Sequence, residues 1–129
     1  MTLQAASKVG YDFKRWEDAE GNTVTEIALG TYGHLNLKAI FEIIVYHITY
    51  QLNDGINHQD NPTAYTVDST TILLSTPTKV GHTFDGWYLD DVKITEISTG
   101  ATGDKVLVAV FNIIVYEWDL ITDTIFPIN

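Results

Sequence analysis

The sequence contains no cysteine, only three prolines and few basic residues. Without cysteine, the chain has neither a disulfide framework nor a thiolate zinc site, and a cysteine nucleophile is excluded as well. Seven lysines and arginines stand against 17 acidic residues, which leaves a formal net charge of −10. Nucleic-acid binding depends on basic side chains that neutralise phosphates, so this charge argues against a nucleic-acid partner and against anionic membrane surfaces.

The chain also lacks a long uninterrupted apolar run. Its longest apolar stretch, residues 35–52, is broken by Lys38, Glu42 and His47, so we do not expect this segment to insert into a membrane. The first residues show neither the basic start nor the apolar core of a signal peptide. If the protein is exported, we therefore expect its signal and any anchor to lie outside this segment. Hydrophobic residues make up 45% of the sequence, which is enough for a folded core.

An internal repeat is the strongest pattern in the sequence. Residues 8–16 match residues 79–87, which lie 71 positions later, and Ile-Ile-Val-Tyr at 43–46 recurs unchanged at 113–116. These matches predict repeats of about 70 residues. On this interpretation, residues 1–42 are the C-terminal part of a preceding repeat, residues 43–112 are one complete repeat, and residues 113–129 are the opening strand of a following repeat.

Strand patterns dominate the chain, and the sequence predicts a mainly β fold with little helix. Tyr46, Ile48 and Tyr50 alternate with polar residues, as in a half-buried strand. Residues 106–111 are β-branched and apolar on both faces, which predicts a central strand. Phe84 and Trp87 would face opposite sides of a regular strand, so we expect a bulge at residues 85–86, where glycine tolerates positive φ. The first repeat has Arg15 at that position, which we expect to fit the bulge less well.

The sequence has no flexible linker between repeats. No glycine, proline or serine separates Phe41 from Ile43 or Phe111 from Ile113, so we expect neighbouring repeats to be closely coupled. An unbroken strand over residues 35–52 would be roughly 60 Å long, so we expect a bend near Glu42. We also expect residues 113–121 to pair with the incomplete repeat 1–42, either within one chain or by strand exchange between chains.

These patterns together resemble the Listeria–Bacteroides repeat family, also called internalin B-repeats. The resemblance rests on Gly-x-x-Phe-x-Gly-Trp-Tyr at 81–88, Thr-Gly-Asp at 102–104 and Tyr-x-Ile-Thr-Tyr-x-Leu-Asn-x-Gly at 46–55. It implies small β-grasp-like modules in extracellular proteins of bacteria, without catalytic residues. Arg15 in place of glycine and Val-Phe at 110–111 depart from the family pattern. The repeat signature comprises Gly10, Phe13, Trp16, Gly81, Phe84, Gly86, Trp87, Ala109 and Phe111.

No residue pattern indicates catalysis, a cofactor or a metal ion. The four histidines, at positions 34, 47, 58 and 82, lack metal-ligand spacing. The polar residues of 53–60 lack the spacing of an EF-hand, and we interpret them as a solvated turn. Trp16, Trp87 and Trp118 stand at core-type strand positions, which favours packing over sugar stacking. Lys79, Lys93 and Lys105 are candidates for an isopeptide cross-link, but the sequence assigns them no acid partner.

Two functions remain open from the sequence. The first is a non-catalytic module that acts as a stiff spacer or scaffold and contacts the neighbouring repeats of its own chain. The alternative is an adhesin-type module that binds a host protein or a glycan, with ligand-binding residues that the sequence does not identify.

Overall fold

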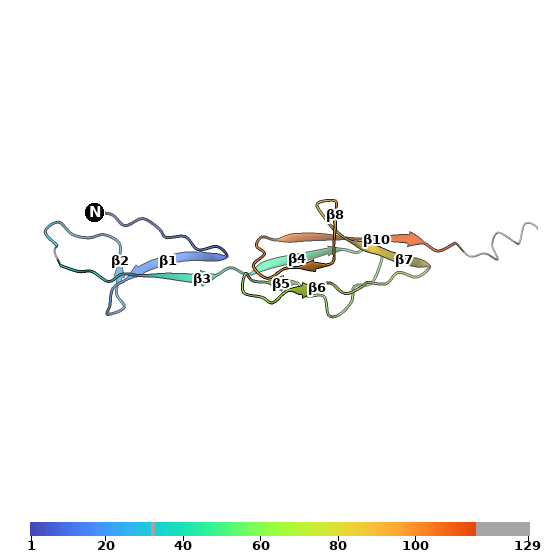
Figure 1. Cartoon of the computed structure of the whole chain (residues 1–129), viewed down its shortest axis with the longest axis horizontal. Coiled ribbons are helices and arrows are strands. Elements are labelled where there is room, and N and C mark those ends of the chain that lie inside the picture. The colour runs from blue at the N-terminus through green and yellow to red at the C-terminus, as the bar shows by residue number, and fades with distance from the viewer. Residues whose placement is uncertain (32, 116–129) are drawn as a thin grey trace, which may run out of the picture.

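The computed structural model describes residues 1–31 and 33–115. Two groups of strands follow one another along the long axis of the molecule (Figure 1). We call residues 1–43 the N-terminal segment and residues 46–113 the module. The strands are β1 (Tyr11–Glu17), β2 (Thr23–Val24), β3 (Lys38–Ile43), β4 (Tyr46–Gln51), β5 (Ala64–Tyr65), β6 (Ile72–Leu73), β7 (His82–Leu89), β8 (Val92–Ile94), β9 (Glu96–Ile97) and β10 (Lys105–Ile113).

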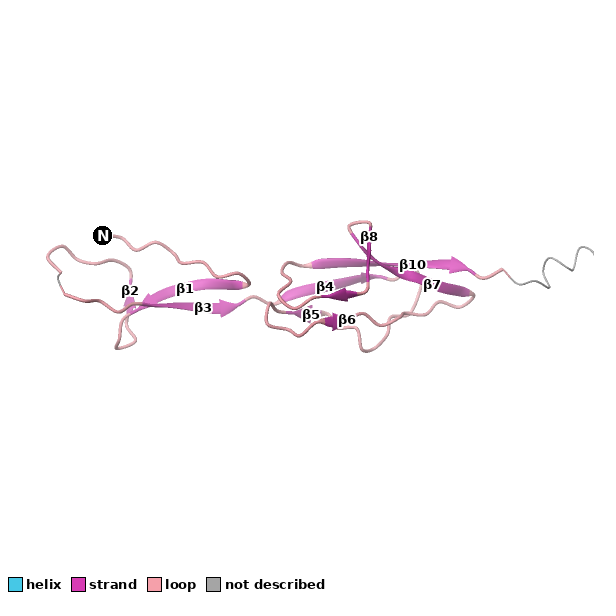
Figure 2. Ribbon diagram, in the orientation of Figure 1, coloured by secondary structure: helices cyan, strands magenta, loops and turns pink. Residues whose placement is uncertain are grey.

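The predicted mainly β fold is confirmed, and the described residues contain no helix (Figure 2). Among them, therefore, no helix could cross a membrane. The module is a five-stranded sheet in the order β5-β4-β10-β7-β8. Its first and last long strands, β4 and β10, are parallel neighbours, whereas the other pairs are antiparallel. Residues 106–111 thus lie in a central strand, as predicted.

The core of the module lies between this sheet and the β6–β9 pair. Leu107 and Ala109 on β10 are fully buried, and Ile97 on β9 packs in the same cluster. The alternation predicted for β4 is present, because Ile48 is buried while its neighbours His47 and Thr49 are exposed. Burial of an aliphatic side chain of this size contributes roughly 1.5–3 kcal/mol. The period-2 pattern therefore determines which face of β4 joins the core.

The predicted bulge is present on β7, but the reason given for Gly86 is wrong. Pairing with β10 shifts register between Phe84 and Gly86, so Asp85 is the extra residue. The bulge brings the rings of Phe84 and Trp87 to 5.5 Å between centroids. Gly86 is not among the residues with positive φ. A Cβ there would lie 2.5 Å from Cε of Lys93, a flexible side chain that can move aside, so proximity favours glycine only weakly.

The N-terminal segment forms a three-stranded sheet in the order β2-β1-β3. The same bulge occurs here, with a register shift between Phe13 and Arg15. The expected misfit of Arg15 is not observed, because Arg15 has no positive φ and its side chain is exposed. Its Nε donates a hydrogen bond to Oε2 of Glu17 at 2.7 Å. The bulge therefore accepts a long side chain that points to solvent.

Only two residues, Ile44 and Val45, separate β3 from β4. The strand is interrupted near Glu42 as expected, since β3 ends at the next residue, Ile43. Most of the strand predicted at 113–121 lies outside the described residues, and so does its proposed pairing with residues 1–42. Its first residue, Ile113, ends β10 opposite His82. The repeat boundaries at 42/43 and 112/113 remain predictions.

Candidate functional site

The signature aromatics form the same cluster twice. In the N-terminal segment, the Phe13 ring lies 5.6 Å from Trp16 and 5.8 Å from Phe41. In the module, the Phe84 ring lies 5.5 Å from both Trp87 and Phe111. Edge-to-face and tilted contacts at these distances stabilise aromatic pairs by about 0.5–1.5 kcal/mol beyond burial. The repeat seen in the sequence is thus also a repeat of side-chain packing.

The indole N–H groups make equivalent bonds in the two halves. Nε1 of Trp16 donates to the carbonyl oxygen of Gln4 at 2.9 Å, and Nε1 of Trp87 donates to that of Ser75 at 3.0 Å. Trp87 is 2% exposed, whereas Trp16 is half-buried. Both side chains therefore pack and hold a neighbouring chain segment, as the sequence interpretation favoured. Trp118 lies outside the described residues.

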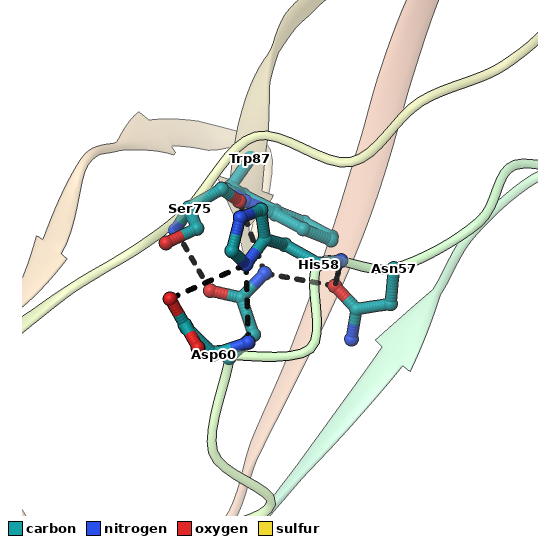
Figure 3. A network of polar contacts seen from close by, with 6 residues as sticks. Asn57, His58, Asp60, Ser75 and Trp87 are labelled. Atoms are coloured by element: carbon teal, nitrogen blue, oxygen red, sulfur yellow. Dashed lines mark hydrogen bonds and ion pairs between the residues drawn. The ribbon is translucent and has the colours of Figure 1, made fainter.

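A buried asparagine, which sequence analysis missed, connects the loop after β4 to the chain after β6. Figure 3 shows this polar network, with Asn57, Ser75 and Trp87 labelled. Asn61 is 7% exposed, and its Oδ1 accepts the Ser75 N–H at 2.7 Å. Its Nδ2 donates to the Ser75 carbonyl at 3.0 Å and to Oδ1 of Asn57 at 2.8 Å. The Ser75 carbonyl also accepts the Trp87 indole N–H. Every polar atom of this amide is therefore engaged in holding the fold.

The polar loop considered for a metal ion is held together by its own hydrogen bonds. Oδ1 of Asn57 accepts the backbone N–H of His58, and Nδ1 of His58 accepts that of Asp60 at 3.0 Å. The Asp60 carboxylate is 3.8 Å from the His58 ring nitrogen, and both side chains are largely exposed. The described residues hold no group of three or more metal-ligating side chains. This arrangement suits a structured turn at the surface.

The remaining candidate side chains lie apart from one another. His34 is in a loop, His47 is exposed on β4, and His82 begins β7. The amine of Lys79 lies 5.8 Å from the centroid of the Phe111 ring, and Lys105 donates to a backbone carbonyl. Lys93 lies 4.0 Å from Asp85 with half of its side chain exposed. The structure brings none of these histidines and lysines together into one site.

The outer face of the module's sheet carries a shallow depression of about 500 Å³ that sequence analysis also missed. Val108 and Val110 of β10 and Tyr88 of β7 form its floor and wall, with Val106 46% exposed beside them. Its full lining is Tyr88, Asp90, Asp91, Val106, Val108 and Val110. The run of β-branched residues at 106–111 was the available signal, but it suggested burial on both faces of the strand. The valine face is instead partly open.

The N-terminal segment touches the module beside the two-residue connection. A Cβ built on Gly10, which has a φ of +82°, would lie 2.4 Å from Cβ of Val67. The Gly10 carbonyl accepts the N–H of Ile44 at 3.0 Å. The hydroxyl of Tyr11 donates to Oδ2 of Asp68, and this bond to a carboxylate raises the pKa of Tyr11 above its usual value. Sequence analysis predicted close coupling here but not the residues that provide it.

Comparisons with known proteins place these features in a family. The family model described as the Listeria-Bacteroides repeat domain matches residues 46–110. A relative described as a Gly-rich membrane protein from Evansella cellulosilytica is 32% identical over 123 residues. This match covers 90% of the chain but 14% of the relative, so the chain spans a small part of that protein. No solved structure matches the chain significantly.

Proposed function

Since the chain belongs to the Listeria-Bacteroides repeat family, we propose that it is a non-catalytic stretch of a tandem array that acts as a stiff spacer in a bacterial surface protein. In this proposal, residues 43–112 are one complete repeat and residues 1–42 are the end of the preceding one. The array holds another part of the same protein away from the cell. Its immediate partners are the neighbouring repeats of its own chain.

The observation that carries the proposal is the contact between Gly10 and Val67. Two residues between β3 and β4 are too few to act as a flexible tether of any length. The close approach of Gly10 to Val67 and the bond from Tyr11 to Asp68 add contacts on either side of this short connection. A connection that is both short and flanked by side-chain contacts resists bending better than a linker alone.

A surface location is supported by the family and by the relative. The relative is described as a membrane protein, and the chain corresponds to only 14% of it. A spacer needs a signal and an anchor elsewhere in its protein, and the relative has ample length for both. We therefore propose an extracellular position for this segment, as part of a longer cell-surface protein.

The side chains support a structural role more than a chemical one. The buried amide of Asn61 and the indole of Trp87 are both engaged with the Ser75 backbone. The hydroxyl of Tyr50 donates to the Pro62 carbonyl at 2.5 Å, and burial raises its pKa to about 12. This hydroxyl is thus held as a hydrogen-bond donor to the backbone. We propose that the segment has no catalytic activity and needs no cofactor.

The alternative function, an adhesin-type module, is favoured by one observation, the open depression around Val108. Its apolar floor and exposed Val106 offer contact area, while Asp90 and Asp91 at its edge would favour a neutral or basic ligand. A host protein is the better candidate than an acidic glycan for this surface. The adhesin alternative is tested by measuring binding of the chain to an array of matrix proteins and glycans. A ligand that occupies the depression should no longer bind to the Val108→Lys variant.

The spacer proposal is tested by a distance measurement across the connection. The chain has no cysteine, so Glu20→Cys with Thr49→Cys places one spin label on each side. Both positions are exposed. The proposal expects one narrow distribution of distances between the labels, measured by pulsed electron paramagnetic resonance. A broad distribution of distances, as expected if the N-terminal segment and the module move independently, overturns the proposal.

A further inference from the structure

We propose that the far end of the module, formed by residues 79–82 with Ile113 and Ile114, is a second docking surface that receives the loop of a following repeat equivalent to residues 66–69. The proposal rests on the spacer function and deepens it, because it names the surface by which the array continues. The occupant is one further repeat of the same family.

The occupied end of the N-terminal segment shows what such docking requires. Gly10 lies against Val67, and Tyr11 donates a hydrogen bond to Asp68. The loop that is received therefore presents an aliphatic side chain followed by a hydrogen-bond acceptor. The receiving end presents a glycine with positive φ, which allows the aliphatic side chain to approach the backbone directly.

The far end of the module has the same backbone geometry. Gly81 has a φ of +75°, compared with +82° for Gly10. The N–H of His82 bonds to the Lys79 carbonyl at 3.1 Å, and the equivalent bond from Tyr11 to Lys8 measures 3.0 Å.

The hydrogen bond that fixes the start of the next chain segment is also repeated. The N–H of Ile114 bonds to the carbonyl of Gly81 at 2.9 Å, as that of Ile44 bonds to Gly10 at 3.0 Å. The ring of His82 lies 6.5 Å from that of Phe111, and the ring of Tyr11 lies 6.5 Å from that of Phe41. The backbone hydrogen bonds and the ring-to-ring distances therefore match those of the end that already carries a module, whereas His82 stands in place of Tyr11, which donates to Asp68.

The two ends differ in what covers them. Gly10 is buried, whereas a Cβ on Gly81 would meet no atom within 4 Å among residues 1–31 and 33–115. Ile113 is 71% exposed, whereas its counterpart Ile43 is half-buried. The far end of the module therefore exposes apolar surface, whereas the equivalent surface of the N-terminal segment is partly covered. Val80 does not distinguish the two ends, because its counterpart Val9 is also exposed beside the occupied junction.

The sequence indicates the occupant. Residues 113–116 repeat residues 43–46 without change, so the chain after Ile113 opens as the module that docks on Gly10 does. In the present chain the loop at 66–69 is already engaged with Gly10. A second copy of this chain could use the far end only after releasing that loop, which makes a following repeat in the same chain the better occupant.

The test adds one repeat in the natural register, as residues 1–115 followed by residues 46–129. Spin labels at both copies of Thr49→Cys report across the new junction, and Glu20→Cys with the first Thr49→Cys reports across the existing one. Gly81→Val is made in the first copy. Gly100→Val is its matched control, because Gly100 has a φ of +90° and meets no described atom within 4 Å.

A narrow distance distribution across the new junction, lost in Gly81→Val and kept in Gly100→Val, supports the inference. A broad distribution across the new junction with a narrow one across the existing junction overturns it and leaves the spacer function intact. Broad distributions across both overturn the spacer function itself. A narrow distribution that survives Gly81→Val also overturns the inference. Gly81→Val in the original chain checks folding, since its cooperative unfolding should match that of Gly100→Val.

Discussion

Gly10 and Val67 meet so closely that a Cβ on Gly10 would stand 2.4 Å from Cβ of Val67. Two constraints converge on Gly10, since its φ of +82° and its contact with Val67 both disfavour any side chain. Gly81, 71 residues later, shares the positive φ, but a Cβ on Gly81 would have no described atom within 4 Å. The contact at the junction therefore adds to the turn as a reason for glycine at position 10.

We expect Gly10→Ala to weaken the junction. The positive φ costs an alanine about 1 kcal/mol, and the collision with Val67 adds roughly 1–3 kcal/mol. Gly21→Ala is the matched control, because Gly21 has a φ of +87° and no described atom within 4 Å of its Cβ site. Hydrogen exchange at the Ile44 amide is the measurement. Equal exchange rates in the two variants would contradict the role of the contact.

The junction should loosen at alkaline pH. The bond to Asp68 raises the pKa of Tyr11 in the folded chain, so the folded state favours the neutral phenol. Its contribution is complete below the unfolded pKa, near 10, and is lost as the pH rises through the higher folded value. Tyr11→Phe should remove this dependence. The distance distribution across the junction, recorded between pH 8 and 11 in both proteins, is the test, and identical pH profiles would count against the contact.

We expect Asn61→Ala to destabilise the module by about 1–3 kcal/mol, because it removes a buried amide and leaves the N–H of half-buried Ser75 without its partner. Asn36→Ala, at an exposed loop position, is the control and should change stability by less than about 0.5 kcal/mol. Urea unfolding followed by tryptophan fluorescence measures both. Similar midpoints for the two variants would show that Asn61 does not hold this part of the fold.

Two glycines with ordinary φ should respond differently to alanine. At Gly55 a Cβ would lie 2.7 Å from the Phe111 ring and 3.0 Å from the Leu52 carbonyl oxygen, so Gly55→Ala should cost roughly 1–3 kcal/mol. At Gly86 it meets the far end of the flexible Lys93 side chain, so Gly86→Ala should cost less than about 1 kcal/mol. Thermal unfolding compares the two variants, and the reverse order of stability would refute the contacts inferred at these two glycines.

Much of the fold follows from local patterns. The alternation around Ile48 predicted the buried face of β4, and the three-residue spacing of Phe84 and Trp87 predicted a bulge. Both depend on the period of a strand, which a sequence displays directly. The family resemblance was confirmed by the match at residues 46–110.

What the sequence did not predict depends on contacts between distant segments. Tyr11 and Asp68 are 57 positions apart, and Asn61 and Ser75 meet through two loops that lack periodicity. No pattern marks such pairs before the chain is folded. The depression beside Val108 was missed for a related reason, because a β-branched run looks the same whether its second face is covered or open.

A stiff spacer requires that the N-terminal segment and the module move as one body. Residual dipolar couplings of backbone amides, measured on the unlabelled chain in a weakly aligning medium, test it most directly. The claim requires that couplings from β1 and β3 and those from β4, β7 and β10 fit a single alignment tensor of one magnitude and orientation. Two tensors of clearly different magnitude would mean that the segments reorient independently, and the spacer would not be stiff.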